Sequence, residues 1–390
     1  MADHRARAEG GTFLDGPRAP KRPRYATLWR LFRGNRLALL GLVCFVAFFL
    51  SATAGLVLTS GNDPVLDPSL VRLPERLRPP LAEADLDALG PGEAPPLGVY
   101  LLGTDDLGRD IFARMLQGAW VSLTVGFVAV GISVLIGILL GGLAGYYGTR
   151  AIRVDQLLAA GLAVSAALLI LADRTGAGLA LLAFGGAAVA ASILKRPAPG
   201  GRPRGFWPAV WFRNTVSVDT VVMRFVDIML CFPSFFLILT VVALLPASIY
   251  NIMIIIGLTS WMGTTRFVRA EFLSLREQDF VSAARVLGLG DFRIIFRHMM
   301  PNAVAPVLVS ATIGIATAIL TEAGLSFLGF GVPPPHATWG NILSDGKRFI
   351  FDAPWLTFIP GTAILIVVLS FNLFGEGLRD ALNPKLEHRQ

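Results

Sequence analysis

Long apolar runs alternate with polar, basic stretches along this chain, and the apolar runs predict its architecture. A helix needs roughly 20 apolar residues to cross the hydrocarbon layer of a bilayer, which is about 30 Å thick. Runs that reach or approach this length lie at residues 37–59, 120–147, 220–245, 249–265, 303–325 and 355–374. They predict an all-α, polytopic membrane protein with a core of six spans, and Pro233 predicts a kink in the third.

Two further apolar runs, at residues 157–172 and 177–194, are short and rich in Ala and Gly. Basic residues flank the pair at both outer ends: Arg150, Arg153, Lys195, Arg196, Arg202 and Arg204. This pattern predicts an inserted helical hairpin that enters from the cytoplasm and returns to it. Membrane packing, lipid contact and docking of another subunit all stay open as its role.

These patterns divide the chain into consecutive segments. The predicted order is a cytoplasmic basic tail (1–36), a first span (37–59), an external loop (60–119), a second span (120–148), the inserted hairpin with an interfacial segment (149–217), the remaining core (218–377) with a cytoplasmic loop (266–301), and a cytoplasmic C-terminus (378–390).

Composition and charge agree with a membrane location. Hydrophobic residues make up 54% of the chain and charged residues 16%, whereas a soluble protein has about 25% charged residues. The net charge of +7 reflects Lys and Arg in the predicted cytoplasmic segments, as the positive-inside rule requires, so we expect no nucleic-acid partner. Cys44 and Cys231 lie in apolar runs and predict no disulfide, and the four histidines have no metal-ligand spacing. No metal or cofactor is therefore expected.

Small residues recur at every fourth position in the second predicted span. Gly137, Gly141 and Gly145 lie on one helix face, where small residues let two backbones approach closely in lipid. The spacing favours helix packing over a substrate path.

The polar interruption at residues 266–301 begins with a helical pattern. Leu273, Phe280, Ala284 and Leu287 fall at i, i+7, i+11 and i+14, which predicts one apolar stripe, and Gly288 predicts its end. Such a helix either lays its apolar face into a groove of a partner or lies on the lipid surface. The pattern alone leaves both interpretations open.

Four ordered segments carry a resemblance to a known family. They are residues 102–110 (LGTDDLGRD), the loop at 266–301, residues 325–341 and residues 371–382. Together they resemble the C-type permease subunit of dipeptide and oligopeptide ABC importers, whose fold is a six-helix, type I permease core. The loop is similar to that family's EAA loop, with Ser282 where the family has its first acidic residue.

The resemblance implies a function and a set of partners. It implies a permease subunit that pairs with a second homologous permease subunit, two ATP-binding ABC subunits and an external solute-binding protein in the bacterial plasma (inner) membrane. Both termini would be cytoplasmic, and the residues that couple to the ATPase would be Asp279, Ser282, Ala283, Ala284, Arg285, Gly288 and Pro301. Because Ser282 stands where the family has an acidic residue, the charged contact that this acid can make to the ATPase is not expected here.

Other functions remain as alternatives. The same fold imports nickel or other small solutes in related systems, and an ion-coupled secondary transporter would use ionisable residues within spans, such as Asp227 and Glu322. A membrane scaffold without transport is a third hypothesis. Residues 103–110 resemble a phosphate loop, but Arg109 and Asp110 replace its Lys and Ser or Thr. We therefore predict that the chain is not an enzyme and that partners hydrolyse ATP.

Overall fold

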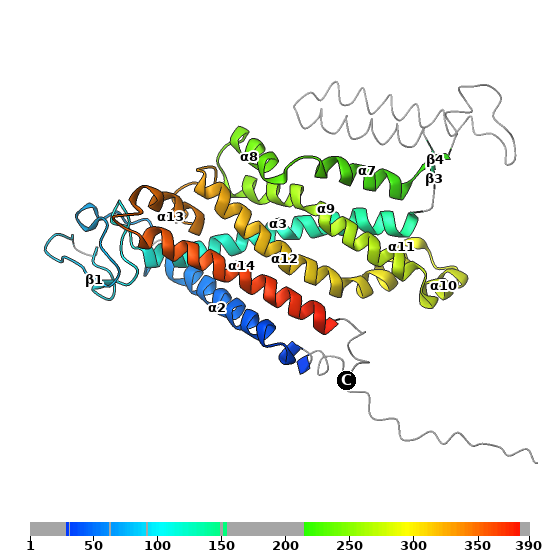
Figure 1. Cartoon of the computed structure of the whole chain (residues 1–390), viewed down its shortest axis with the longest axis horizontal. Helices are drawn as coiled ribbons and strands as arrows, with labels where there is room; N and C mark the ends of the chain where they lie inside the picture. The colour runs from blue at the N-terminus through cyan, green and yellow to red at the C-terminus, as the bar shows by residue number, and fades with distance from the viewer. Residues whose placement is uncertain are drawn as a thin grey trace, which may run out of the picture.

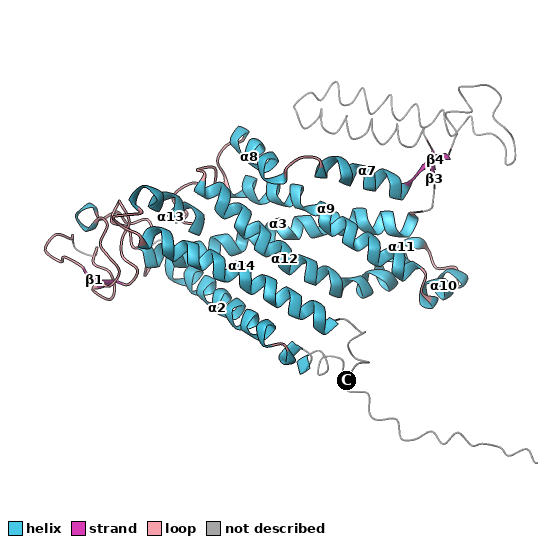
Figure 2. Cartoon of the chain, in the orientation of Figure 1, coloured by secondary structure: helices cyan, strands magenta, loops and turns pink. Residues whose placement is uncertain are grey.

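The computed structural model describes residues 29–30, 32–61, 64–90, 93–148, 151–153 and 214–382. Nearly all of the inserted segment predicted at 149–217 lies outside the described residues, and so do most of the basic tail and residues 383–390. Helices dominate the part of the chain that is described, and its strands are short (Figure 2).

Long apolar helices form the body of the molecule. Four helical segments of the described chain are long and apolar enough to cross a membrane: Arg36–Thr59 (α2), Ile111–Tyr147 (α3), Asp291–Phe327 (α11, a π-helical segment and α12) and Trp355–Leu382 (α14). Within the third, α11 is Asp291–Arg293, the π-helical segment is Ile294–Met299 and α12 is Met300–Phe327.

A fifth span is present if two shorter helices are counted together. Helices α7 (Val218–Leu230) and α8 (Ser234–Leu244) meet at a bend of 77°. Pro233 is the N-cap of α8, so the predicted kink lies where proline ends one helix and starts the next.

The remaining predicted span, at residues 249–265, corresponds to α9 (Ile249–Arg276), which is not among the helices apolar enough to be counted. The second half of α9 carries Arg266, Arg269 and Glu271, so the helix extends beyond the apolar run at 249–265 into a polar region. The described chain thus has four or five apolar spans, with α9 packed beside them, where the sequence predicted six.

Figure 1 shows the long helices running along one common direction: α2, α3, α9, α12 and α14. Helices α3 and α9 lie side by side and start at the same end, whereas α12 runs back along α3 and α14 runs back along α2. Residues 64–110 and α13 (Trp339–Gly346) gather at one end, which we call the head end. Helix α10 (Asp279–Val286) lies at the opposite end, the α10 end, where α2 begins and α14 finishes.

The three predicted packing glycines lie at the contact between α3 and α9. A Cβ atom on Gly137 would lie 2.6 Å from the Thr264 Cβ atom, and one on Gly145 would lie 2.5 Å from the Phe272 Cβ atom. Gly141 would meet the Thr265 carbonyl oxygen at 2.6 Å. Any larger side chain would push the two helices apart, so these glycines set the distance between α3 and α9.

Short strands occur at two places. In the head, β1 (Ala82–Glu83) pairs antiparallel with β2 (Val99–Tyr100), and a 3₁₀ turn, Leu73–Glu75, precedes them. After α3, β3 (Ala151–Arg153) pairs antiparallel with β4 (Asn214–Ser217). The second pair holds residues 151–153 beside residues 214–217, near the two ends of the segment predicted as an insertion.

Candidate functional site

Helix α10 is separated from α9 by a turn. Helix α9 ends at Arg276, and α10 starts after its N-cap, Gln278. The turn separates Leu273 on α9 from the later residues of the predicted stripe, and α10 itself packs with Val281 and Ala284 inward, which leaves Phe280 and Leu287 outside. The predicted single stripe is therefore wrong: Ala284 is buried, whereas Phe280 and Leu287 are exposed.

The inner face of α10 anchors it to the body of the protein. Val281 and Ala284 are buried in a cluster with Phe272 of α9, Ile294 and Met299. Burial of these side chains against α9 and the start of the α11–α12 segment fixes the position of α10 without any partner.

The outer face of α10 is apolar and has no covering element among the described residues. It consists of Phe280, Ala283, Val286 and Leu287, which are all exposed. Val286 and Leu287 are 88% and 78% exposed, and Phe292 of α11 is 75% exposed beside them in sequence. Ser282 is exposed as well, and Asp279 is exposed at the first position of α10. We call the four apolar residues the α10 outer face.

Gly288 ends α10 through a double hydrogen bond of the Schellman type. The Gly288 N–H donates to the Arg285 carbonyl at 3.0 Å, and the Leu289 N–H donates to the Ala284 carbonyl at 3.1 Å. Gly288 has a φ of +73°, and no atom lies within 4 Å of where its Cβ would be. The position needs glycine for its backbone conformation and not for lack of space.

Arg285 and Tyr146 connect α10 with α3. The Arg285 guanidinium lies 5.3 Å from the centre of the Tyr146 ring, and the Tyr146 hydroxyl donates to an Asp291 carboxyl oxygen at 2.6 Å. Of the predicted coupling residues, Asp279 and Ser282 to Arg285 lie in α10 and Gly288 ends it, whereas Pro301 is the exposed second residue of α12. Sequence reasoning missed Val286 and Tyr146, because no pattern along the chain joins Tyr146 of α3 to α10, which begins at Asp279.

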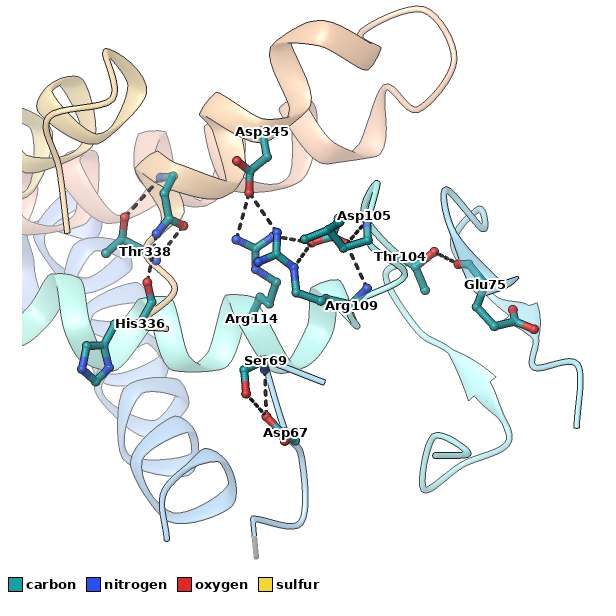
Figure 3. Close-up of polar contacts among 12 residues, drawn as sticks. Asp67, Ser69, Glu75, Thr104, Asp105, Arg109, Arg114, His336, Thr338 and Asp345 are labelled. Carbon is teal, nitrogen blue, oxygen red and sulfur yellow. Dashed lines mark hydrogen bonds and ion pairs between the residues drawn. The ribbon is translucent and has the colours of Figure 1, made fainter. Parts of the chain in front are cut away.

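A second polar site holds the head together (Figure 3). The fully buried carboxylate of Asp105 accepts hydrogen bonds from the backbone N–H groups of Leu107 and Arg109, each at 2.9 Å. It also pairs with the Arg109 and Arg114 guanidiniums. Asp345 of α13 pairs with the same two arginines, at 3.3 and 3.0 Å. Two carboxylates and two guanidiniums therefore fasten the head loop and α13 to the start of α3.

The remaining residues of the 102–110 segment have structural roles. Asp110 caps α3 by accepting a hydrogen bond from the Phe112 N–H at 2.8 Å. Gly108 has a φ of +72°, and a Cβ atom there would lie 1.8 Å from the Arg72 carbonyl oxygen. The Trp355 indole N–H donates to the Thr104 carbonyl at 3.2 Å. These contacts explain the segment without a bound phosphate.

The two ionisable residues considered for ion coupling have partners. Asp227 pairs with Arg266 at 2.7 Å and with Arg224 at 3.6 Å. Glu322 is fully buried and accepts hydrogen bonds from the hydroxyls of Ser326 at 2.7 Å and Ser122 at 3.2 Å. Both carboxyls therefore act as links between helices in this structure.

Comparison with known proteins places the chain in a family. Residues 201–388 match the family described as binding-protein-dependent transport system inner membrane component. The dipeptide transport system permease protein DppC of Alkalihalophilus pseudofirmus is 35% identical over 92% of this chain and 89% of its own length. The oligopeptide transport system permease protein OppC of Bacillus subtilis is 30% identical, covering 92% and 90%. DppC of Haemophilus influenzae is 32% identical, covering 95% and 97%.

The chain belongs to the family of inner membrane permease components of binding-protein-dependent transport systems. It is a multi-pass helical membrane protein and a permease subunit of an ABC importer. The resemblance drawn from four sequence segments is thus confirmed, and family membership selects a permease over a secondary transporter or a scaffold.

Proposed function

We propose that this chain forms part of the membrane pathway of an importer for di- or oligopeptides and that α10 couples this pathway to ATP hydrolysis in partner subunits. The peptide substrate is supported by the relatives, which are dipeptide and oligopeptide permeases over nearly their whole lengths. The α10 outer face, four exposed apolar residues on a helix held firmly from behind, is the observation that carries the coupling role.

An exposed apolar face on a rigid helix suits docking into a groove of another protein. The short α10 is fixed by Val281 and Ala284, so a push on its outer face is transmitted to α9 and to the α11–α12 segment. The partner that fits is an ATP-binding ABC subunit, two of which would serve this chain and a second, homologous permease subunit. The chain itself then supplies no ATP site.

The orientation follows from the same assignment. The α10 end would face the cytoplasm together with both termini, and the head end would face outward, where an external solute-binding protein delivers peptide. Arg266, Arg269, Arg276, Arg285, Arg293 and Arg297 support this orientation, because they lie in and around the α10 end. With Ser282 in place of an acid, docking would rest on apolar contact more than on a charged pair.

The test is peptide uptake by the complete transporter in proteoliposomes, with its binding protein and ATP. We expect wild-type transporter to accumulate a labelled dipeptide, and Leu287→Asp to lose both uptake and co-purifying ATPase subunits, because a charge would be buried at the interface. Leu97→Asp is the matched control at the head, where Leu97 is 69% exposed, and it should retain the ATPase subunits.

Different outcomes would contradict the coupling role of α10 and the peptide substrate. Normal ATPase association and uptake in Leu287→Asp would contradict the coupling role. ATP-dependent uptake of nickel or another solute, with no uptake of any di- or oligopeptide, would contradict the substrate.

A further inference from the structure

An apolar groove lies where α2 begins and α14 ends, away from the α10 outer face and from the head. It has a volume of about 290 Å³ and is lined by Trp29, Phe32, Leu42, Phe374, Leu378, Ala381 and Leu382. Every lining side chain is apolar, so water in the groove would find few hydrogen-bond partners.

Aromatic contacts give this groove fixed walls. The rings of Trp29 and Phe32 are stacked at 6.2 Å, and Phe32 meets Phe374 edge-on at 5.8 Å. Behind them α2 and α14 are in close contact, since a Cβ atom on Gly377 would lie 2.2 Å from the Ala38 Cβ atom. The groove is therefore a feature of the helix packing and not a gap between loose side chains.

Basic residues neighbour the groove lining in sequence, at the start of α2 and the end of α14. The exposed arginines that neighbour the lining residues in sequence are Arg30, Arg33, Arg36 and Arg379, and the exposed acids of the same stretches are Glu376 and Asp380. Four guanidiniums against two carboxylates give these two stretches, which meet at the α10 end, a net positive charge. None of the four arginines forms an ion pair with another described residue.

The groove also extends in the right direction for a lipid. Leu42 lies six residues beyond Arg36 in α2, which is about 9 Å deeper along the helix axis at 1.5 Å per residue. Trp29, 53% exposed, lies at the charged end, as tryptophan does at membrane interfaces. One end of the groove is thus cationic and interfacial, and the other is apolar and within the span.

We propose that this groove binds an anionic phospholipid from the leaflet at the α10 end. One acyl chain would lie against Phe32, Leu42 and Phe374, and the phosphate would contact Arg30 and Arg33. Basic residues near a membrane surface attract anionic lipids, so several arginines select an anionic headgroup over a zwitterionic one. This inference rests on the membrane location of the helices and not on the transported solute.

The test measures quenching of Trp29 fluorescence by lipids with brominated acyl chains. The complete transporter is placed in phosphatidylcholine nanodiscs that contain a small fraction of brominated phosphatidylglycerol or, in parallel, brominated phosphatidylcholine. The Trp29 signal is the difference between wild type and Trp29→Phe. We expect quenching by phosphatidylglycerol to be several-fold stronger than by phosphatidylcholine at equal fraction.

Two variants and one control separate charge from general lipid contact. The triple variant R30S/R33S/R36S should bring quenching by phosphatidylglycerol down to the phosphatidylcholine level, and Leu378→Phe, which fills the groove, should weaken quenching by both lipids. Arg293→Ser, an exposed arginine at the same end of the molecule, should change neither.

Three results would overturn the inference. Equal quenching by the two lipids would show ordinary boundary lipid. Selective quenching that appears only after deletion of residues 2–24 would show that the basic tail occupies the groove. Selective quenching of the isolated chain that is absent in the complete transporter would show that another subunit covers it.

Discussion

Single residues at the α10 end act through either backbone conformation or side-chain contact, and the structure separates the two. Gly288 has a left-handed backbone and open space around it, whereas Gly290 has a φ of −67° and equally open space. The sequence shows two similar glycines, two residues apart. Because their backbone angles differ, only the replacement of Gly288 should destabilise the protein.

We therefore expect Gly288→Ala to destabilise the end of α10 and Gly290→Ala to be tolerated. Holding alanine in the left-handed region costs about 1–2 kcal/mol, and the two capping hydrogen bonds depend on that conformation. Hydrogen exchange of the α10 amides should become roughly five- to thirty-fold faster in Gly288→Ala. Equal exchange rates in the two variants would contradict this account.

Asp106 in the head loop is a residue whose charge is costly. Burial raises the pKa of the Asp106 carboxyl above its ordinary value, and the nearby carboxylates of Asp105 and Asp345 raise it further against the opposing charge of Arg109. The folded protein therefore holds this proton more tightly than the unfolded chain does. Stability is lost as the pH rises from the unfolded value, about 3.9, through the raised pKa of the folded state.

Asp106→Asn removes this cost because asparagine does not ionise. We expect its melting temperature to exceed that of wild type at pH 7 and to match it at about pH 4. The contrasting variant is Asp345→Asn, which should lower the melting temperature at pH 7 because it leaves Arg109 and Arg114 with one carboxylate fewer. A lower melting temperature for Asp106→Asn at pH 7 would show that the Asp106 charge is stabilising.

At the scale of elements, α10 has one face buried against the body of the protein and one exposed face. The sequence offers Ala283 and Ala284 as one pair of small residues, but Ala284 is buried against the body of the protein and Ala283 is exposed. Large side chains at these adjacent positions should therefore have different effects, one on stability and the other on association with the ATPase subunits.

We expect Ala284→Trp to overfill the inner face and cost about 1–3 kcal/mol of stability, lowering the melting temperature of the purified chain. Ala283→Trp should leave that temperature within error and reduce co-purification of the ATPase subunits, because it enlarges the docking face. Melting curves and subunit ratios after affinity purification measure both effects. The same loss of stability in both variants would mean that α10 does not have separate faces.

At the scale of the whole molecule, the helix directions place the starts of α2 and α7 and the ends of α9 and α14 together at the α10 end (Figure 1). The head lies at the other end, fastened by the Asp105–Arg114–Asp345 network. The two ends should therefore face opposite sides of the membrane.

Cysteine labelling tests this arrangement in a background that lacks Cys44 and Cys231, which are free in the structure. Leu97→Cys in the head should react with an impermeant thiol reagent added to intact spheroplasts, and Val286→Cys on α10 should react only after lysis. Both side chains are well exposed in the chain, at 69% and 88%, so access is set by the membrane when the permease is expressed without the ATPase subunits that would cover α10. Labelling of position 286 from outside would invert the proposed orientation.

The sequence by itself determined the membrane class, the helical fold and the family. The length of the apolar runs and the low charged fraction decide which segments cross the membrane. The free-energy cost of placing a segment in hydrocarbon depends mainly on its own residues and less on the segments packed around it. The bend at Pro233 was likewise predictable, since proline lacks the N–H that a continuous helix requires.

Only the tertiary structure decided which side of α10 is exposed and which residues the 102–110 segment contacts. Val281 and Ala284 are the buried positions of α10 because they pack against Phe272, Ile294 and Met299, and the two-residue turn after Arg276 meant that the spacing in α9 could not predict this side. Arg114 and Asp345, 231 residues apart, meet because α3 and α13 are packed together at the head end. Local sequence patterns predict which side chains are buried. The residues that these side chains contact depend on how helices distant in sequence pack against one another.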